Sequence, residues 1–379
     1  MNLKRKLPLL VLGIYMGLNF PAFSQTTYQT PPQAIADLVN APSTPSVSFS
    51  KKGDWMMLLE RADNPSIEEL AQPELRIAGM RINPATSGPS RSRGVENIKI
   101  KMTRSGEEIQ IKGLPEKASI GGLALSRDEK YLAFTNTEAN GISLWVVDMS
   151  NFEAKKLTDA ILNDVYGNVM TWTPDNQILI KAVNPGRGSI PKAPAAPAGP
   201  VVQETTGNAA PSRTYQDLLS NPYDEALFAY FMDSQMMLVG LDGSKKAVGA
   251  SGMIKSFDLS PDGSYILVDV IRKPFSYLVP ASRFPYDVEI WSKEGKKVKT
   301  LAEIPLDEER PTGFDATVTG PRSINWRADK PAILYWVEAQ DGGDGKVKME
   351  EREIVYTLAA PFSGQKQKLA TTSLRFGGI

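Results

Sequence analysis

A short pattern that recurs along the chain constrains the fold more than any other feature of the sequence. Residues 257–267 read FDLSPDGSYIL: an alternating apolar segment ending in Ser, a turn built on Pro-Asp-Gly, and a second apolar and aromatic segment. This pattern predicts a β-hairpin, because Asp can hydrogen-bond to the backbone two residues on and Gly accepts a positive φ. Similar segments occur at 47–59, 123–134, 170–180 and, more loosely, 324–336.

Further strand pairs lie between these copies, so that each copy is the first half of a four-stranded unit. Examples are NIKIKM with EIQI at 97–111 and the segment DVEIWSKEGKKVKTLAEI at 287–304. Repetition of such a unit is typical of a β-propeller. We therefore predict an all-β fold, an incomplete β-propeller of about five to six blades with short helical insertions. An antiparallel sandwich is the alternative, and the recurrence of one signature argues against it.

The spacing of the copies predicts insertions. Ser126 and Thr173 are 47 residues apart, which fits a bare blade of about 40 to 50 residues, whereas the other copies are 67 to 87 residues apart. Residues 185–210 are rich in Pro, Ala and Gly and predict an exposed loop. Residues 212–234 combine a Ser cap with apolar residues at helical spacing, which predicts a helical insertion. Ser66 is expected to cap another short helix.

Two missing residue types limit the chemistry of the chain. The sequence has no Cys and no His, which excludes disulfides, a thiolate nucleophile and a Ser-His-Asp triad within this chain. The 43 basic and 43 acidic residues cancel, so nucleic acid and an anionic membrane surface are not expected partners. No nucleotide motif and no G-x-S-x-G elbow is present. We predict no catalytic residue, no metal ligand and no cofactor.

The first 24 residues have the form of a secretory signal peptide. Three basic residues precede a short apolar run, and small residues lead to a cleavage site between Ser24 and Gln25. A membrane anchor is the alternative, but the apolar run is shorter than a span requires. We therefore expect residues 25–379 to form a periplasmic or secreted propeller domain, with no membrane segment after cleavage.

Several polar and aromatic residues are candidates for a catalytic, metal-binding or carbohydrate-binding site. The carboxylate clusters Asp307–Glu309 and Glu350, Glu351 and Glu353 could perform acid/base work, but we expect them to be solvated loops. Asp341 and Asp344 lie among glycines, where Ca²⁺ could bind, but a plain hairpin connection is the simpler interpretation. The Trp residues at 55, 145, 172, 291, 326 and 336 fall on predicted strands and are expected to pack between blades; a carbohydrate-stacking surface is the alternative.

Three long stretches carry a resemblance to a known family. Residues 28–91, 213–231 and 320–344 are similar, in order, to segments of the glutamyl endopeptidase branch of the prolyl oligopeptidase (S9) family. These are serine peptidases with an N-terminal propeller and a C-terminal α/β-hydrolase domain. The resemblance implies a propeller of seven blades that acts as a lid and admits short or flexible peptides. It also places the Ser, Asp and His of the triad in the hydrolase domain, so no catalytic residue can be carried over.

The resemblance therefore implies that the chain is the N-terminal, substrate-gating propeller of an exported serine peptidase, truncated before the hydrolase domain and inactive by itself. Its expected partners are peptides, in the full-length parent, and the missing hydrolase domain. An incomplete ring is expected to leave an open edge that promotes oligomerisation. The alternative is a stand-alone periplasmic propeller that serves as a binding or scaffold module.

Overall fold

The computed structural model describes residues 30–378 apart from 63, 197–213 and 312. The predicted signal peptide, its cleavage site at Ser24 and Gln25 and the second half of the predicted loop 185–210 lie outside the described residues. The chain divides into two units, residues 1–42 and residues 43–379. The first unit contains one short helix, α2 (Gln33–Val39), which has no buried residue.

The second unit consists of successive four-stranded antiparallel sheets, which we number as blades 1 to 5 in chain order. Blade 1 comprises β1 (Ser46–Phe49), β2 (Trp55–Glu60), β6 (Asn97–Met102) and β7 (Glu108–Gln110). Blade 2 comprises β8 (Ile120–Leu125), β9 (Tyr131–Glu138), β10 (Gly141–Asp148) and β11 (Glu153–Lys156). Blade 3 comprises β12 (Met170–Trp172), β13 (Ile178–Val183), β14 (Asp233–Val239) and the first half of β15 (Lys245–Leu259). Blade 4 comprises the second half of β15, β16 (Tyr265–Ile271), β17 (Tyr286–Ser292) and β18 (Lys297–Ile304). Blade 5 comprises β19 (Pro321–Trp326), β20 (Ile333–Ala339), β21 (Glu353–Ala359) and β22 (Gln367–Thr372).

The long strand β15 joins two blades without a loop. Its residues 245–253 pair with β14, and residues 254–259 pair with β16. Hydrogen bonds therefore join blades 3 and 4 into one seven-stranded sheet. We count them as two blades because their side chains pack against each other. The predicted all-β propeller is confirmed, and the five blades of the described residues fall within the predicted number.

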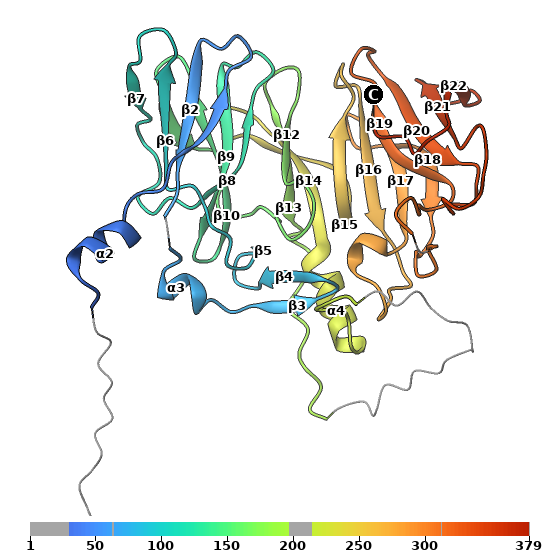
Figure 1. Cartoon of the computed structure of the whole chain (residues 1–379), viewed down its shortest axis with the longest axis horizontal. Coiled ribbons are helices and arrows are strands. Elements are labelled where there is room, and N and C mark those ends of the chain that lie inside the picture. The colour runs from blue at the N-terminus through green and yellow to red at the C-terminus, as the bar shows by residue number, and fades with distance from the viewer. Residues whose placement is uncertain (1–29, 63, 197–213, 312, 379) are drawn as a thin grey trace, which may run out of the picture. The chain divides into compact units, whose positions relative to one another are not determined.

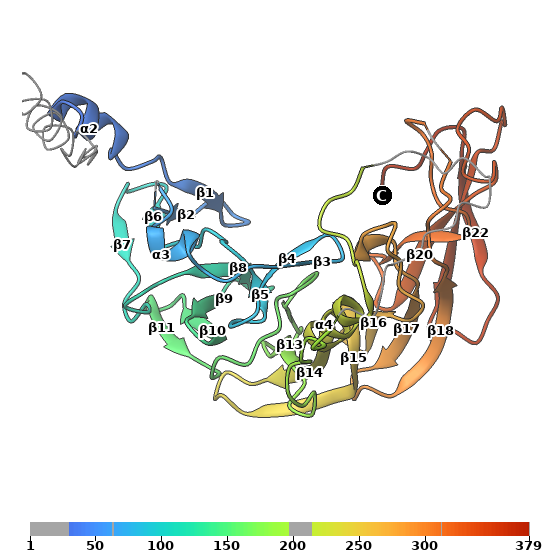
Figure 2. The same ribbon diagram turned by 90° about the horizontal axis from the view of Figure 1, so that it is seen from below.

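Neighbouring blades bury their apolar faces against each other. One core cluster joins blades 1 and 2 through residues such as Ile100 and Phe134, and a second joins blades 2 and 3 through Leu144 and Ile180. Two further clusters connect blade 3 to blade 4 and blade 4 to blade 5. Figure 2 shows the sheets side by side in this order. Each blade thus depends on its neighbours for the cover that a single sheet lacks.

The recurring Ser or Thr of the sequence pattern closes the turn between the first two strands of a blade. In three copies its buried hydroxyl donates to the Asp two residues later and accepts the N–H of a residue at the end of the turn. The donated bonds are Ser126 to Asp128 (2.8 Å), Thr173 to Asp175 (2.5 Å) and Ser260 to Asp262 (2.6 Å). The accepted bonds come from Tyr131 (3.1 Å), Gln177 (2.9 Å) and Tyr265 (3.0 Å). We call the connections between the first two strands of the five blades, residues 50–54, 126–130, 173–177, 260–264 and 327–332, the signature turns.

The signature turns also connect blade to blade. Glu129 in the turn of blade 2 accepts the N–H of Lys51 in the turn of blade 1 at 2.8 Å. Asn176 of blade 3 donates to Asp128 of blade 2 at 3.2 Å. The N–H of Asp262 in blade 4 donates to the carbonyl of Pro331, which follows the turn of blade 5, at 3.1 Å. The signature turns therefore gather at one end of the blades.

Two Trp side chains make equivalent bonds between blades. Trp172 Nε1 donates to the carbonyl of Ala124 at 2.8 Å, and Trp326 Nε1 donates to the carbonyl of Asp258 at 3.2 Å. In both cases the acceptor lies two residues before the signature Ser of the preceding blade. The predicted role of Trp in packing between blades is confirmed, since all six lie on strands and none is exposed.

Replacing Ser260 by Ala tests the signature turn. The change removes a fully buried hydroxyl that accepts the N–H of Tyr265 and donates to the exposed carboxylate of Asp262. The N–H of Tyr265 then loses its acceptor, so we expect the free energy of unfolding to fall by about 1–3 kcal/mol. Urea unfolding measures this loss. Ser189→Ala, at an exposed position, is the control and should change stability little; equal effects of the two variants would contradict the role of the turn.

Candidate functional site: a cap built from three insertions

Three segments that interrupt the blades meet at the ends of the strands remote from the signature turns. Each segment follows the second strand of a blade, which runs away from its signature turn. The segments are residues 61–96 after β2, residues 184–232 after β13 and residues 272–285 after β16. Figure 1 shows β3, β4 and α4 of these segments together at one end of the sheets. We call their joint structure the cap.

The first segment contains a short helix and a small sheet. The helix α3 (Ile67–Leu70) begins at Ser66, whose hydroxyl accepts the N–H of Glu69 at 3.0 Å, while the Glu69 carboxylate accepts the N–H of Ser66 at 2.7 Å. The predicted cap at Ser66 is confirmed as a complete capping box. The sheet comprises β3 (Leu75–Ile77), β4 (Met80–Asn83) and β5 (Gly88–Pro89).

The second and third segments contribute helices. α4 (Pro222–Met232) begins at Asn221, whose side chain accepts the N–H of Asp224 at 3.0 Å, and Pro222 occupies the first helical position. The helix lies within the range 212–234 where the sequence predicts one. The third segment contains a single 3₁₀ turn, η1 (Ala281–Arg283).

Aromatic side chains hold the cap together. Phe228 of α4 makes edge contacts with Phe275 and Phe284 of the third segment, with ring centroids 4.9 and 5.3 Å apart. Ile77 and Ile82 of the small sheet belong to the same buried cluster. Each such aromatic pair adds about 0.5–1.5 kcal/mol beyond its buried area. The three insertions therefore form one apolar core of their own.

A tight turn brings the small sheet against the third segment. Gly79 has a φ of +77°, and a Cβ at this position would lie 2.5 Å from Cβ of Pro280. Next to it, the carbonyl of Ala78 accepts the N–H of Ala281 at 2.8 Å, and the N–H of Gly79 donates to the carbonyl of Asp217. Glycine is thus required here for both backbone conformation and close approach.

Buried ionisable groups lie beneath the cap. Lys181 of β13 is 1% exposed and donates to the carbonyl of Tyr166, while the backbone N–H of Asp164 donates to the carbonyl of Ser87 in the small sheet. Burial raises the pKa of Asp164 to about 6, against the opposing effect of the Lys181 ammonium. Burial likewise lowers the pKa of Lys181 to about 8, against the effect of Asp164. The charge of each group thus opposes the effect of burial on the pKa of the other, although the two form no direct ion pair.

Asp307 and Glu308 of the first predicted carboxylate cluster lie in the connection between β18 and β19 and are not free in a solvated loop. Asp307 lies 3.8 Å from Arg283 and forms a second ion pair with Arg310. The Glu308 carboxylate accepts a hydrogen bond from the hydroxyl of Ser276. The expectation of free solvated carboxylates is wrong for these two residues, because arginine and serine side chains from the loops that meet there bind them.

The second predicted carboxylate cluster and the predicted glycine-rich loop meet in blade 5. The carboxylates of Glu353 and Asp341 are fully buried and share the guanidinium group of Arg375, while Arg322 pairs with Glu353 and Arg352 with Asp341. The expectation of a solvated loop is therefore wrong for Glu353, which lies on β21, although Glu350 and Glu351 are exposed. The arginines occupy the carboxylate oxygens that a cation would need.

The interpretation of the glycine-rich stretch around Asp341 and Asp344 as a hairpin connection is confirmed, since it lies between the antiparallel strands β20 and β21. The Asp344 carboxylate accepts the backbone N–H of Lys346. Among the described residues, no group of three or more acidic side chains is arranged to hold a metal ion.

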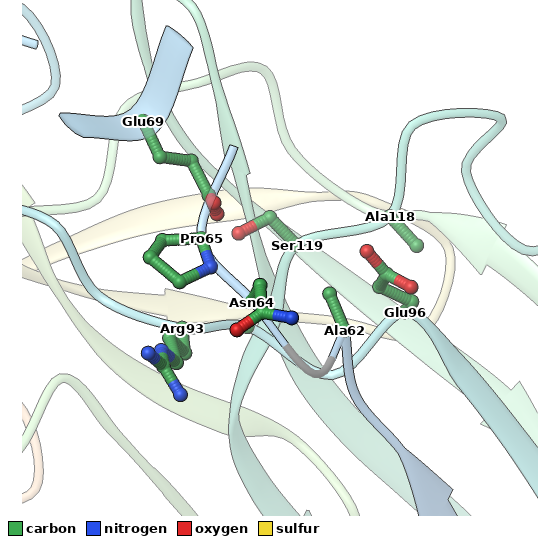
Figure 3. Close-up of a pocket in the computed structure, with 9 residues that line it drawn as sticks. Ala62, Asn64, Pro65, Glu69, Arg93, Glu96, Ala118 and Ser119 are labelled. Atoms are coloured by element: carbon green, nitrogen blue, oxygen red, sulfur yellow. The ribbon is translucent and has the colours of Figure 1, made fainter. Parts of the chain in front are cut away.

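A small cavity lies between the first insertion and blade 2. It has a volume of about 40 Å³ and is lined by residues including Asn64, Glu69, Arg93, Glu96 and Ser119 (Figure 3). This space holds about one water molecule and is too small for an amino-acid side chain to enter. We therefore do not assign a substrate site to it.

The comparisons with known proteins can be set beside this geometry. No family model matches the chain. The chain is 36% identical over 367 residues to the probable glutamyl endopeptidase, chloroplastic, of Oryza sativa subsp. japonica, and 38% identical over 370 residues to the protein of the same name from Arabidopsis thaliana. Each alignment covers 93% of this chain, which spans 39% and 38% of the length of the two relatives.

The chain is a homologue of the glutamyl endopeptidases. The resemblance seen in the sequence is confirmed, and the match to little more than a third of each relative agrees with a propeller portion of such a peptidase. Among solved structures, the acylaminoacyl peptidase of Pyrococcus horikoshii aligns at 12% identity with a TM-score of 0.40, covering 86% of this chain and 39% of that one.

The segments that carried the resemblance have definite places in this glutamyl endopeptidase homologue. Residues 61–91 and 214–231 build two of the three parts of the cap, and residues 320–344 supply strands and a loop of blade 5. No helix among the described residues combines the length and hydropathy needed to cross a bilayer.

Stability should depend on pH through Asp164. The folded-state pKa of about 6 lies above the ordinary value near 3.9, so the folded protein binds a proton more tightly and loses stability as the pH rises from about 4 to 6. Asp164→Asn cannot ionise. We therefore expect its stability relative to the wild type to increase over this range, by on the order of 1–3 kcal/mol.

Urea unfolding of both proteins between pH 4 and 7 measures this difference. The control is Asp159→Asn, at an exposed position on the same connection, which should give a curve parallel to that of the wild type. A parallel curve for Asp164→Asn as well would contradict a buried, pKa-raised carboxylate beneath the cap.

Proposed function

We propose that the chain acts as the substrate-gating propeller of a larger serine peptidase of the glutamyl endopeptidase type, with the cap as the part that meets the peptide substrate. The single observation that carries the proposal is the identity of 36–38% across 93% of the chain with proteins named glutamyl endopeptidase. The chain itself supplies no His and therefore no Ser-His-Asp triad. The nucleophile and its base would come from the remainder of the parent protein.

The cap supports this assignment to the substrate side of the propeller. Insertions of three blades pack there into a common apolar core, and loops held on a rigid scaffold commonly carry binding residues. At the other end of the blades, the signature turns bind mainly to one another. The signature turns thus stabilise the arrangement of the blades, whereas the cap is the end that we assign to substrate contact.

We also propose that residues 1–24 direct export and are removed between Ser24 and Gln25. The proposal rests on the basic, apolar and small-residue order of this segment. The curated relatives are described as chloroplastic, and an export signal in this chain would place the same kind of propeller in the periplasm or outside the cell. Mass spectrometry of the native product should find a mature N-terminus at Gln25.

The peptidase proposal predicts a division of activity between this chain and its full-length parent. Purified residues 25–379 should not hydrolyse a blocked peptide that contains Glu, whereas the full-length product should hydrolyse it and lose activity with a serine-directed inhibitor. Antibody against the propeller should detect the larger native protein. Hydrolysis by residues 25–379 alone, or a native product no larger than this chain, would contradict the proposal.

A further inference from the structure

The face of blade 1 that points away from blade 2 carries apolar side chains that other blades do not cover. Val47 and Phe49 of β1 are 48% and 61% exposed. They pair with Leu58 and Met56 of β2, and residues paired across strands lie on one face of the sheet. Met57 points the other way, into the cluster shared with blade 2. None of the four belongs to a buried cluster of the described residues. We call these four residues the blade 1 patch.

The same positions are buried in other blades. Counted from the recurring Ser at position 50, the patch occupies positions three and one before it and six and eight after it. The corresponding positions of two later blades pack against the preceding blade: Leu123, Leu125, Leu132 and Phe134 in blade 2, and Phe257, Leu259, Ile266 and Val268 in blade 4. The blade 1 patch therefore has the composition of one half of a junction between blades.

The outer strands of this face carry two ion pairs. Lys99 and Lys101 of β6 lie on it, because they pair with the two β2 residues of the patch. The Lys99 ammonium is 2.6 Å from the carboxylate of Glu60, and the Lys101 ammonium is 2.8 Å from that of Glu108. All four side chains are at least 31% exposed. Burial of these charges against a purely apolar sheet would remove their hydration without compensation, so a partner must itself carry charges of both signs.

At the other end of the series of blades, the chain covers its own sheet. On the face of blade 5 that points away from blade 4, Val337 and Val355 are paired with each other and only 0% and 1% exposed. Arg375 pairs with Glu353 on this face at 3.1 Å, and the N–H of Phe376 donates to the same carboxylate at 2.6 Å. The inner part of this face is therefore closed to a second copy of the chain, whereas the blade 1 patch is open to one.

We propose that two copies of residues 25–379 associate through the blade 1 patch into a dimer with two-fold symmetry. A two-fold axis perpendicular to the strands places the apolar inner strands of the two copies over each other, and likewise the charged outer strands. Each outer half then meets a face with two Lys and two Glu, so the contact is complementary to itself as a two-fold interface requires. Such a dimer is independent of the proposed peptidase function.

Sedimentation velocity of residues 25–379 over a hundredfold range of micromolar concentration measures the association. We expect monomer to convert reversibly to dimer as the concentration rises, because one sheet face is smaller than the interface of an obligate dimer. We expect no larger species, since a closed two-fold contact uses the patch of both copies and blade 5 offers no second site.

Substitutions locate the interface. Phe49→Glu places a charge within the patch and should weaken the dimer at least tenfold. Val298→Glu is the matched control, at a Val that is 43% exposed on β18, the outer strand of blade 4, and it should dimerise like the wild type. Circular dichroism checks that both variants are folded. If Phe49→Glu is unfolded, Val47→Glu at the neighbouring exposed position decides.

The absence of Cys from the chain allows a direct test of symmetry. With mild oxidation, Phe49→Cys should form a disulfide-linked dimer, because the same residue of both copies lies in the interface. Val298→Cys, treated in the same way, should remain mainly unlinked. Equal cross-linking of the two variants would show random collision and would overturn the assignment of the interface.

Other outcomes would also overturn the two-fold dimer. These are a monomer over the whole concentration range, unchanged dimerisation of Phe49→Glu, and growth beyond the dimer, which would indicate head-to-tail contacts. A monomer that Phe49→Glu destabilises would show that another segment of the same chain covers the patch. None of these results bears on hydrolysis by the full-length product, and failure of that product to cleave peptides would leave the dimer unaffected.

Discussion

The structure depends on the burial of one sheet face by the next. Each blade offers an apolar surface, and clusters of buried side chains lie at every junction from blade 1 to blade 5. This packing has no direction of its own, so other contacts must set the angle and register of neighbouring blades. The signature turns do so at one end, where Glu129 and Asp128 receive hydrogen bonds from the adjacent turns. The side chains of Trp172 and Trp326 also fix the register of neighbouring blades, because each donates a hydrogen bond to the preceding blade.

The cap covers the other end of the blades. The difference between the two ends, turns at one and insertions at the other, could be predicted only in part. The repeat could be recognised in the sequence because apolar and polar residues alternate in its strands and because its turn is stabilised locally. Ser260 and Asp262, for example, hydrogen-bond to each other within the same turn. The uneven spacing of the repeats also indicated that the chain carries insertions, but not that residues 272–285 form one of them. The packing of these insertions against each other could not be predicted. Phe228 and Phe275 are distant in sequence, and neither segment has a strong amphipathic pattern from which its packing partner could be inferred.

The carboxylates show the same limit of local reasoning more sharply. Glu353 and Asp307 lie in sequences dominated by charged residues, which suggested solvated loops. Glu353 is nevertheless on a strand whose far partners include Arg322 and Arg375, and it is fully buried. A buried carboxylate is tolerated when it is paired and hydrogen-bonded, and the arginines that permit it lie 22 to 31 residues away. The sequence shows which residues are charged, but it does not show which of them form ion pairs.

Ion pairing accounts for the buried acids of blade 5 and for Asp307, because arginines match these carboxylates. It does not account for every cation with little access to water. Lys181 is 1% exposed and its ammonium donates to the carbonyl of Tyr166, while Arg187 stacks on Tyr230 and donates to the hydroxyl of Ser87. Backbone, hydroxyl and aromatic groups therefore take the place of an acid where segments far apart in the sequence meet in and beneath the cap.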